Sequence, residues 1–377
     1  MSEVYKDMLP EEFKKYGYQI IDWIADYLSE LDFYPVVPQL KPGEIKNKLP
    51  ESAPKTEEDF TEIIKDFEKL IVPGITHWQH PKFMAYFSAT ASGPGIFGEL
   101  LAAAINTNGM VWKSNPSSTE LEETVLNWFR EIIGLPKEYF GVVYDTASVS
   151  TMHAIAAARE NTGLDIRTKG LSGLPMLRLY CTEQTHSSID KSALTLGIGL
   201  DGICKVPTDE NFAMIPSELE KAIEEDRSKG IVPFCVVATI GTTSSTAVDP
   251  VNEIAEICKR EKIWLHVDAA YAGVTAMLPE MKKYFVGIEK ADSFVVNPHK
   301  WLFVPIDFSV LFTRKPKILK QAFSIVPDYL KTQEDSEVIN YMDYGIQLGR
   351  RFRSLKFWFV LRYFGVVRLQ KIIREHL

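Results

Sequence analysis

The stretch Ile263-Trp264-Leu265-His266-Val267-Asp268-Ala269-Ala270-Tyr271-Ala272-Gly273 decides the fold class of this chain. Its first residues are almost purely apolar, which is typical of a strand buried on both faces of a parallel sheet. The run ends in a carboxylate followed by small residues, so Asp268 is expected at the carboxyl end of the strand, where open α/β sheets bind ligands. A lone Asp there is also typical of a structural cap, and both roles stay open at this point.

Similar short apolar runs alternate with helical segments on both sides of this stretch. The predicted strands are residues 141–144, 176–181, 202–206, 233–239, 263–267, 293–296 and 308–313. Helices are predicted between most of them, for example at residues 216–225 and 250–261. This alternation predicts an α/β fold with a mostly parallel sheet and helices on both faces.

The first ninety residues have a different pattern. Apolar residues at three- and four-residue steps predict an amphipathic helix over residues 10–31, and a second helix is predicted near residues 56–70. The prolines from Pro35 to Pro54 exclude regular helix and central strand between them, so we expect an extended arm there. An apolar helix on such an arm indicates contact with a partner subunit.

We therefore predict three parts: an N-terminal helical dimerisation arm (residues 1–92), a large α/β domain (93–355) and the start of a truncated C-terminal small domain (356–377). Within the large domain a helix is expected after Asn115, with a capping box formed by Ser117 and Glu120. The chain stops at Leu377 inside helical sequence without a glycine stop signal.

Composition excludes several classes of protein. The chain has 377 residues, 46% hydrophobic and 24% charged, which is typical of a globular protein with a real core. A net charge of −8 disfavours nucleic acid and anionic membrane surfaces, so an anionic ligand needs a local positive site. The longest apolar run, residues 231–240, is about half of a membrane span, and the N-terminus has no signal-peptide pattern, so we expect a cytoplasmic protein.

Cysteine and histidine spacing gives no metal site. The four cysteines are widely spaced in apolar stretches and are expected to be reduced core thiols. His77 and His80 lack a carboxylate or cysteine at ligand spacing, so no metal is expected. The basic cluster from Arg350 to Lys356 favours local ion pairs or a subunit interface over nucleic acid.

A lysine follows the strand candidate in Ser293-Phe294-Val295-Val296-Asn297-Pro298-His299-Lys300-Trp301-Leu302. Apolar and aromatic neighbours remove water from such an amine, which lowers its pKa and leaves a neutral nucleophile that can form a Schiff base. The alternative is a lysine that extends toward solvent and pairs with a carboxylate.

Two more strand ends carry polar residues. After the first strand the segment Asp145-Thr146-Ala147-Ser148 precedes an alanine-rich helix. The backbone N–H groups and dipole of this helix would bind a phosphate. The alternative is that the segment is an ordinary helix cap. His186 follows the strand at residues 176–181 and is either a ring-stacking or a structural histidine. Together, a phosphate cradle, a histidine, a strand-end Asp and a desolvated lysine are the parts that hold pyridoxal phosphate.

The chain resembles the pyridoxal-phosphate-dependent group II amino-acid decarboxylases, and most closely the aromatic-L-amino-acid decarboxylases, from about residue 10 to residue 377. The most specific stretches are PGITHW (73–78), TELE (119–122), NFAM (211–214), WLHVDAAYAG (264–273), NPHKW (297–301) and LGRRFRSLK (348–356). This resemblance implies the fold-type I architecture of pyridoxal-phosphate enzymes, an aromatic amino acid as substrate and a homodimer with shared active sites.

The resemblance also implies roles for individual residues. Lys300 is expected to form the Schiff base, Asp268 to contact the pyridinium nitrogen, and His186 to stack on the ring. Further cofactor contacts are expected from Ala147, Ser148, Thr243, Ala270, Asn297 and His299. Substrate contacts are expected from Trp78, Tyr86 and Phe87, while Trp112 is equally well explained by core packing.

Tyr329 matches the catalytic tyrosine of the family's mobile loop and is expected to protonate the carbanion carbon after carbon dioxide leaves. Related aldehyde synthases lack this tyrosine or the stacking histidine, and both are present here, so an amine product is expected. The alternatives are an aromatic aldehyde synthase, or a catalytically impaired dimerising or regulatory protein because of the truncated end. Ala89 stands where relatives often have a hydroxyl residue, which disfavours a catechol substrate.

Overall fold

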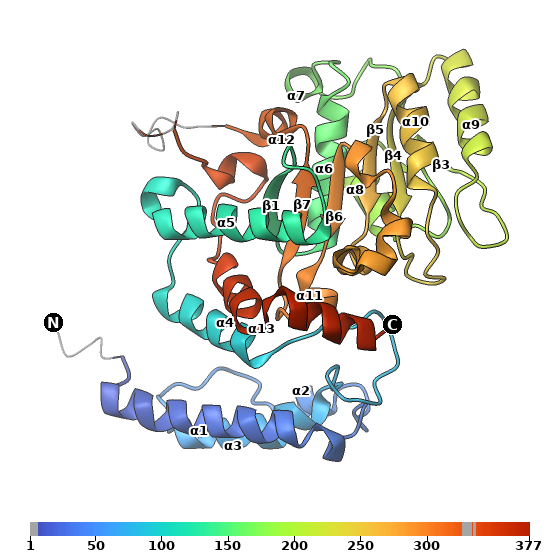
Figure 1. Cartoon of the computed structure of the whole chain (residues 1–377). Coiled ribbons are helices and arrows are strands. Elements are labelled where there is room, and N and C mark those ends of the chain that lie inside the picture. Colours follow the sequence, from blue (N-terminus) through green and yellow to red (C-terminus); the bar gives the residue numbers. More distant parts are fainter. Residues whose placement is uncertain (1–6, 326–333, 335–336) are drawn as a thin grey trace. The chain divides into compact units, whose positions relative to one another are not determined.

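The computed structural model describes residues 7–325, 334 and 337–377, and its internal contacts divide the chain into two units, Met1–Tyr86 and Phe87–Leu377. The first unit contains α1 (Pro10–Ser29), α2 (Glu44–Lys48) and α3 (Phe60–Asp66), followed by a π-helical turn (Phe67–Ile71). Figure 1 shows these helices in blue. The two predicted helices are thus present, although the second begins at Phe60, where the Asp59 side chain accepts a hydrogen bond from the Thr61 N–H.

Helix α2 corrects the expectation that no helix forms between the prolines of the arm. Gly43 adopts a left-handed conformation with φ 93°, which starts the helix directly after Pro42, and Leu49 ends it directly before Pro50. One helical turn fits between two prolines because each ring lies outside the hydrogen-bonded residues. Aromatic rings then hold the unit together: Trp23 stacks on Tyr27, whose hydroxyl lies 2.8 Å from His77 Nδ1.

A seven-stranded sheet forms the centre of the second unit, with the order β1-β7-β6-β5-β4-β2-β3 among the described residues. The strands are β1 (Phe140–Tyr144), β2 (Leu177–Cys181), β3 (Ile203–Lys205), β4 (Val232–Thr239), β5 (Trp264–Asp268), β6 (Ser293–Val296) and β7 (Ser309–Thr313). Within this sheet β7 pairs antiparallel with β1 and β6, and the other described pairs are parallel. All seven predicted strands are confirmed, and their ends differ by at most one residue.

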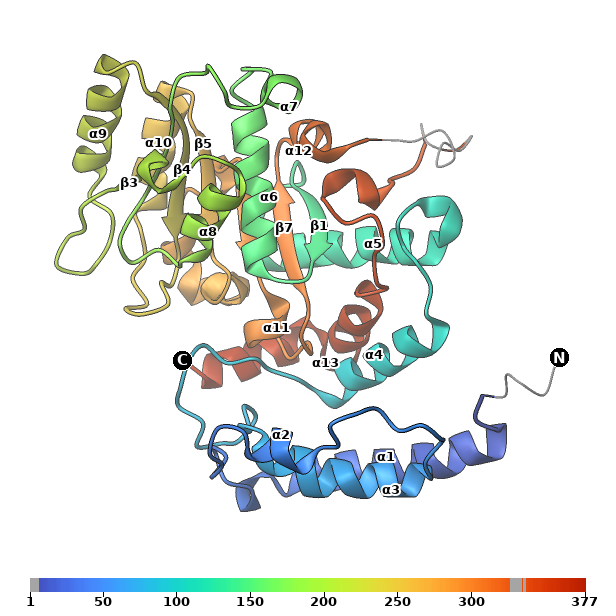
Figure 2. The ribbon, with the colours of Figure 1, turned by 180° about the vertical axis from the view of Figure 1, so that it is seen from behind.

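Helices cover both faces of the sheet, as predicted. One face packs against α5 (Pro116–Ile133), α9 (Pro216–Ser228), α10 (Val251–Glu261) and α13 (Ser354–Glu375). The other packs against α6 (Ala147–Glu160), α8 (Ser188–Thr195) and α12 (Pro316–Phe323), with α6 and α8 in front of the strands in Figure 2. Side chains alternate between the two cores: Val236 of β4 joins the first and Val237 the second.

The division into units differs from the predicted boundary at residue 92. Residues 87–92 belong to the second unit because they hydrogen bond to the segment after β6: Thr90 N–H donates to the His299 carbonyl at 3.0 Å, and the Ser92 hydroxyl donates to the Phe303 carbonyl at 2.7 Å. The following helix α4 (Gly93–Ile105) packs against α13. A Cβ at Gly98 would lie 2.5 Å from Lys356 Cα, so this close contact requires glycine.

The start of α5 corrects the predicted capping box. Asn115 is the N-cap residue, and its side-chain oxygen accepts a hydrogen bond from the Ser118 N–H at 3.0 Å. Glu120 instead accepts a hydrogen bond from Trp112 Nε1 at 2.8 Å. An asparagine directly before Pro116 therefore caps the helix two residues earlier than Ser117 could.

Two findings bear on the expectations from composition. The four cysteines are free thiols, three buried and Cys204 half-buried. Among the described residues, no helix combines the length and apolar character needed to cross a membrane.

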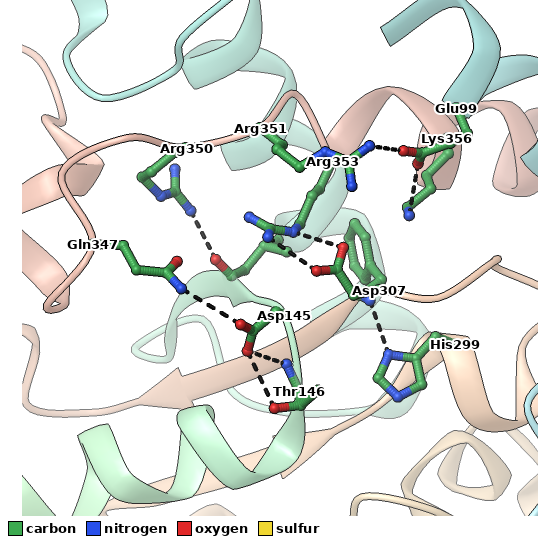
Figure 3. A network of polar contacts seen from close by, with 12 residues as sticks. Glu99, Asp145, Thr146, His299, Asp307, Gln347, Arg350, Arg351, Arg353 and Lys356 are labelled. Carbon is green, nitrogen blue, oxygen red and sulfur yellow. Dashed lines mark hydrogen bonds and ion pairs between the residues drawn. The ribbon is translucent and has the colours of Figure 1, made fainter. Parts of the chain in front are cut away.

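The basic cluster at the start of α13 forms local ion pairs, one of the two expected alternatives. The pairs are Arg350–Glu122, Arg351–Glu99, Arg353–Asp307 and Lys356–Glu99, and Figure 3 shows the last three. Arg350 also donates to the Val143 carbonyl at 2.8 Å, while Glu122 accepts from the Val143 N–H at 3.0 Å. This buried pair therefore joins α5, β1 and the segment before α13.

We expect Glu122→Ala to lower the free energy of unfolding by about 3–5 kcal/mol, because it leaves the Arg350 guanidinium buried without a counter-charge. Chemical denaturation followed by circular dichroism measures this change. Glu131→Ala is the matched control, since Glu131 lies on the same helix with its side chain 72% exposed. Equal denaturation midpoints for the two variants would show that the pair does not stabilise the fold.

Candidate cofactor site

The structure brings all nine residues predicted to contact the cofactor around one cavity of about 230 Å³ at the carboxyl ends of the strands. They are Ala147, Ser148, His186, Thr243, Asp268, Ala270, Asn297, His299 and Lys300. Phe87, predicted to contact substrate, also lines the cavity. The segments that carry these residues are far apart in sequence and meet because parallel strands end at the same edge of the sheet.

The N-terminus of α6 forms one wall of the cavity. The helix begins at Ala147, and the side chain of its N-cap residue Thr146 makes no capping hydrogen bond. Asp145 Oδ1 instead accepts the Thr146 N–H at 2.5 Å, which orients the turn into the helix. The first N–H groups of a helix have no partner within it, so this wall suits an anionic group such as a phosphate.

Lys300 is half-buried in the short helix α11 (Pro298–Trp301), directly after β6. Burial lowers the pKa of its amine, and the charge of Asp268 opposes the shift only in part. Within the described part of the chain, no carboxylate lies within ion-pair distance of Lys300 Nζ, which is 5.6 Å from the centre of the Phe87 ring. These contacts favour the nucleophilic lysine over one paired with a carboxylate.

Asp268 ends β5 and is buried at the cavity wall. Its Oδ1 accepts the Ala270 N–H at 3.0 Å, so it caps the turn after the strand while it also faces the cavity. The structural cap is therefore present, and the ligand role of the same side chain stays a prediction. A carboxylate at this place can hold a proton on a basic ring nitrogen of a ligand.

Two histidines of the cavity are held by backbone N–H groups. His186 Nδ1 accepts from the Ser188 N–H at 3.1 Å, and His299 Nδ1 accepts from the Phe308 N–H at 2.8 Å. In a neutral ring the proton is then on Nε2. Burial lowers the pKa of His186 and, together with the Lys300 charge, lowers the pKa of His299 to about 4, so both rings are neutral at pH 7.

Two buried polar atoms at the cavity wall have no hydrogen-bond partner among the described residues: Thr239 Oγ1 and Asn297 Oδ1. Buried polar groups are nearly always hydrogen bonded, so their partner is expected to be a ligand. A helix N-terminus, a desolvated amine and a carboxylate match the phosphate, the aldehyde and the ring nitrogen of pyridoxal phosphate. The residues present therefore fit this cofactor. The described residues contain no cluster of His, Cys, Asp and Glu that could hold a metal ion.

Sequence reasoning missed part of the cavity wall. The further lining residues are Ser188, Thr239, Gly241 and Tyr271, while Thr146 belongs to the predicted phosphate-binding segment. Thr239 is the last residue of β4, so its position at a strand end was a usable signal. Tyr271 stacks on Phe87 with ring centres 3.9 Å apart and on Trp301 at 4.7 Å, and no local pattern indicates such a stack.

The remaining predicted residues lie elsewhere. Trp78 and Tyr86 belong to the first unit, where their rings stack 5.6 Å apart. Trp112 is half-buried, bonded to Glu120 and not part of the cavity wall. Tyr329 lies outside the described residues.

A family model, curated relatives and solved structures all match this chain, and their names agree with one another. The model of the pyridoxal-dependent decarboxylase conserved domain matches residues 42–377. Tyrosine decarboxylase 4 of Petroselinum crispum is 41% identical over 97% of this chain and 74% of its own length, and phenylacetaldehyde synthase of a Rosa hybrid cultivar is 40% identical over 100% and 75%. The crystal structure of Oryza sativa TDC with PLP and tryptamine matches with a TM-score of 0.95 and 35% identity, over 98% of this chain and 78% of that chain.

We expect Lys300→Ala to abolish covalent attachment of pyridoxal phosphate, because no other amine faces the cavity from the described residues that line it. Borohydride reduction of the protein with added cofactor, followed by peptide mass spectrometry, measures the attachment. Lys290→Ala, which changes an exposed lysine paired with Glu256, should be modified at Lys300 like the wild type. Undiminished attachment to the Lys300→Ala protein would refute the assignment.

Proposed function

This chain belongs to the pyridoxal-dependent decarboxylase family, and from that premise we propose that it decarboxylates an aromatic L-amino acid to the corresponding arylalkylamine. It is a pyridoxal-phosphate-dependent carboxy-lyase. The observation that carries the proposal is the cavity in which Lys300, Asp268 and the N-terminus of α6 converge. The relatives named after tyrosine and tryptophan decarboxylation support an aromatic substrate.

Different residues of the cavity are proposed to bind different parts of pyridoxal phosphate. Pyridoxal phosphate, when bound, supplies the electron sink for the electron pair that remains when carbon dioxide leaves. Lys300 would bind its aldehyde, Asp268 would keep a proton on its ring nitrogen, and the N–H groups of Ala147 and Ser148 would hold its phosphate. Thr243, Ala270, Asn297 and His299 contact the rest of the group.

His186 and the aromatic residues orient the reactants. We assign to His186 a position against the cofactor ring, and to Phe87 a contact with the substrate side chain. Phe87 is already held by its stack on Tyr271, so it needs little further ordering when substrate binds. Aromatic walls also exclude water from the reacting carbon, which strengthens the electrostatic contacts there.

Tyr329 is proposed as the acid that protonates the substrate Cα after carbon dioxide leaves. With Trp78 and Tyr86 as further substrate contacts, it would complete the site. A homodimer is part of the proposal, because the chain exposes large apolar side chains on α4, among them Phe97, Leu100 and Ile105. A cytoplasmic location is proposed as well.

A product assay tests the proposal directly. The protein with added cofactor is incubated with tyrosine, tryptophan, phenylalanine, Dopa or histidine, and amine, aldehyde, ammonia and peroxide are quantified. We expect the amine from at least one aromatic substrate. Aldehyde with ammonia and peroxide would establish the synthase activity instead, and no turnover of any substrate would favour the non-catalytic alternative.

For Tyr329→Phe we expect a large loss of amine, on the order of the 10²- to 10⁴-fold that general acids contribute, with a gain of oxygen-dependent aldehyde and peroxide. The same chromatographic assay measures both products. Tyr284→Phe, at a partly exposed tyrosine away from the cavity wall, serves as the control. An unchanged amine yield in Tyr329→Phe would exclude the proposed role.

A further inference from the structure

Arg353 occupies an unfavourable place for a cation. It is the N-cap residue of α13, its side chain makes no capping hydrogen bond, and the first turn of the helix contains no acidic residue. The positive end of the helix dipole repels a guanidinium at this position. A contact elsewhere must therefore account for the buried Arg353 side chain.

That contact is a two-point ion pair with Asp307. Arg353 Nε lies 2.9 Å from Asp307 Oδ1, and its terminal nitrogen lies 3.0 Å from Oδ2. Figure 3 shows the two side chains facing each other, with the His299 ring nearby. Burial raises the pKa of Asp307, but the hydrogen bond and charge of Arg353, together with the charges of Lys356 and Arg351, outweigh it, and the net shift is downward. A bidentate pair fixes the orientation of the carboxylate as well as its charge.

The residue after Asp307 connects this pair to the cavity. The Phe308 N–H donates to His299 Nδ1 at 2.8 Å, and Phe308 itself is fully buried. His299 lines the cavity directly before Lys300, and its Nε2 lies 3.4 Å from the amide nitrogen of Asn297. A shift of Asp307 would therefore move the Phe308 N–H group that donates to His299 Nδ1.

We propose that Arg353 is a positioning residue for the cofactor site: it holds Asp307, so that the Phe308 N–H keeps His299 Nδ1 as an acceptor and leaves the ring proton on Nε2. The donor is useful only if the cavity binds the phosphate-bearing cofactor, so this inference rests on the proposed function. His299 can then donate to an anion while it remains uncharged.

Charges on several elements act on His299. Besides burial, Lys300 of α11 and Lys356 of α13 lower its pKa, while Asp307 raises it. Removal of Arg353 takes away the bidentate partner of the Asp307 carboxylate, so we expect the pKa of His299 to rise, although burial still holds it below the ordinary histidine value. If the Arg353–Asp307 pair only balances charge, it acts on His299 through the pKa alone. If it is a positioning pair, it also fixes the place of the Phe308 N–H group.

The first test observes the His299 ring in the cofactor-free protein by NMR with ¹⁵N-labelled histidine, its signal identified by its absence in His299→Asn. The wild type should show a single tautomer with the proton on Nε2 and no titration above about pH 5. Arg353→Met should show mixed tautomers and a titration at higher pH. A wild-type signal in this variant would overturn the proposal.

The second test measures pyridoxal phosphate affinity by fluorescence titration. We expect Arg353→Met to weaken binding about 10-fold, the loss of roughly one hydrogen bond, and Arg353→Lys, which keeps the charge, to recover part of it. Arg351→Met is the matched control, because Arg351 is an exposed neighbour that pairs with Glu99. This variant should bind the cofactor like the wild type.

The double variant Arg353→Met/Asp307→Leu separates positioning from charge balance. It removes both charges and leaves none buried and unpaired, so it should fold even if Arg353→Met does not. Mixed His299 tautomers and weakened affinity in the double variant support positioning. Wild-type behaviour there would show that the pair only balances charge. The NMR and binding measurements need no turnover, so they can fail while the proposed decarboxylation succeeds.

Discussion

Parallel strands that are buried on both faces carry mainly apolar side chains along their length, and this constraint organises the second unit. β4, β5 and β6 contribute apolar side chains to two separate cores along their length. Polar residues such as Thr239, Asp268 and Asn297 appear where these strands end. Because the strands are parallel, all these ends meet at one edge, and a cavity with convergent polar groups forms there.

The same edge of the sheet holds the candidate cofactor site. Burial lowers the pKa of Lys300 and of both cavity histidines, which favours the neutral amine and the neutral rings in a protein of net charge −8. Positive character at the site comes from the backbone of α6 instead of from exposed cations. The arginines before α13 are used in ion pairs with Glu122, Glu99 and Asp307.

Periodic signals made the sheet predictable, because a strand buried on both faces needs a continuous apolar run and its end needs a polar residue. The nine cofactor contacts followed from this pattern together with the family resemblance. Helix ends were not predictable in the same way, because neighbouring residues compete for the same capping position. Asn115 displaced Ser117 as a cap, and one helical turn formed between Pro42 and Pro50. The stack of Phe87 on Tyr271 joins residues distant in sequence and leaves no local pattern.

The reversed direction of β7 has a consequence for the order in which the site can assemble. Val296 of β6 pairs directly with Val310 of β7, so the chain between them returns as a hairpin at the cavity edge instead of crossing over the sheet. The hydrogen bond between His299 and Phe308 closes within this return, whereas Asp268 and the start of α6 meet it only after long crossovers. The hairpin between Val296 and Val310, which contains Lys300, is therefore the part of the site with the lowest contact order. Its formation has the smallest loop-closure entropy to overcome. Its local geometry can be established before the phosphate-binding wall is in place.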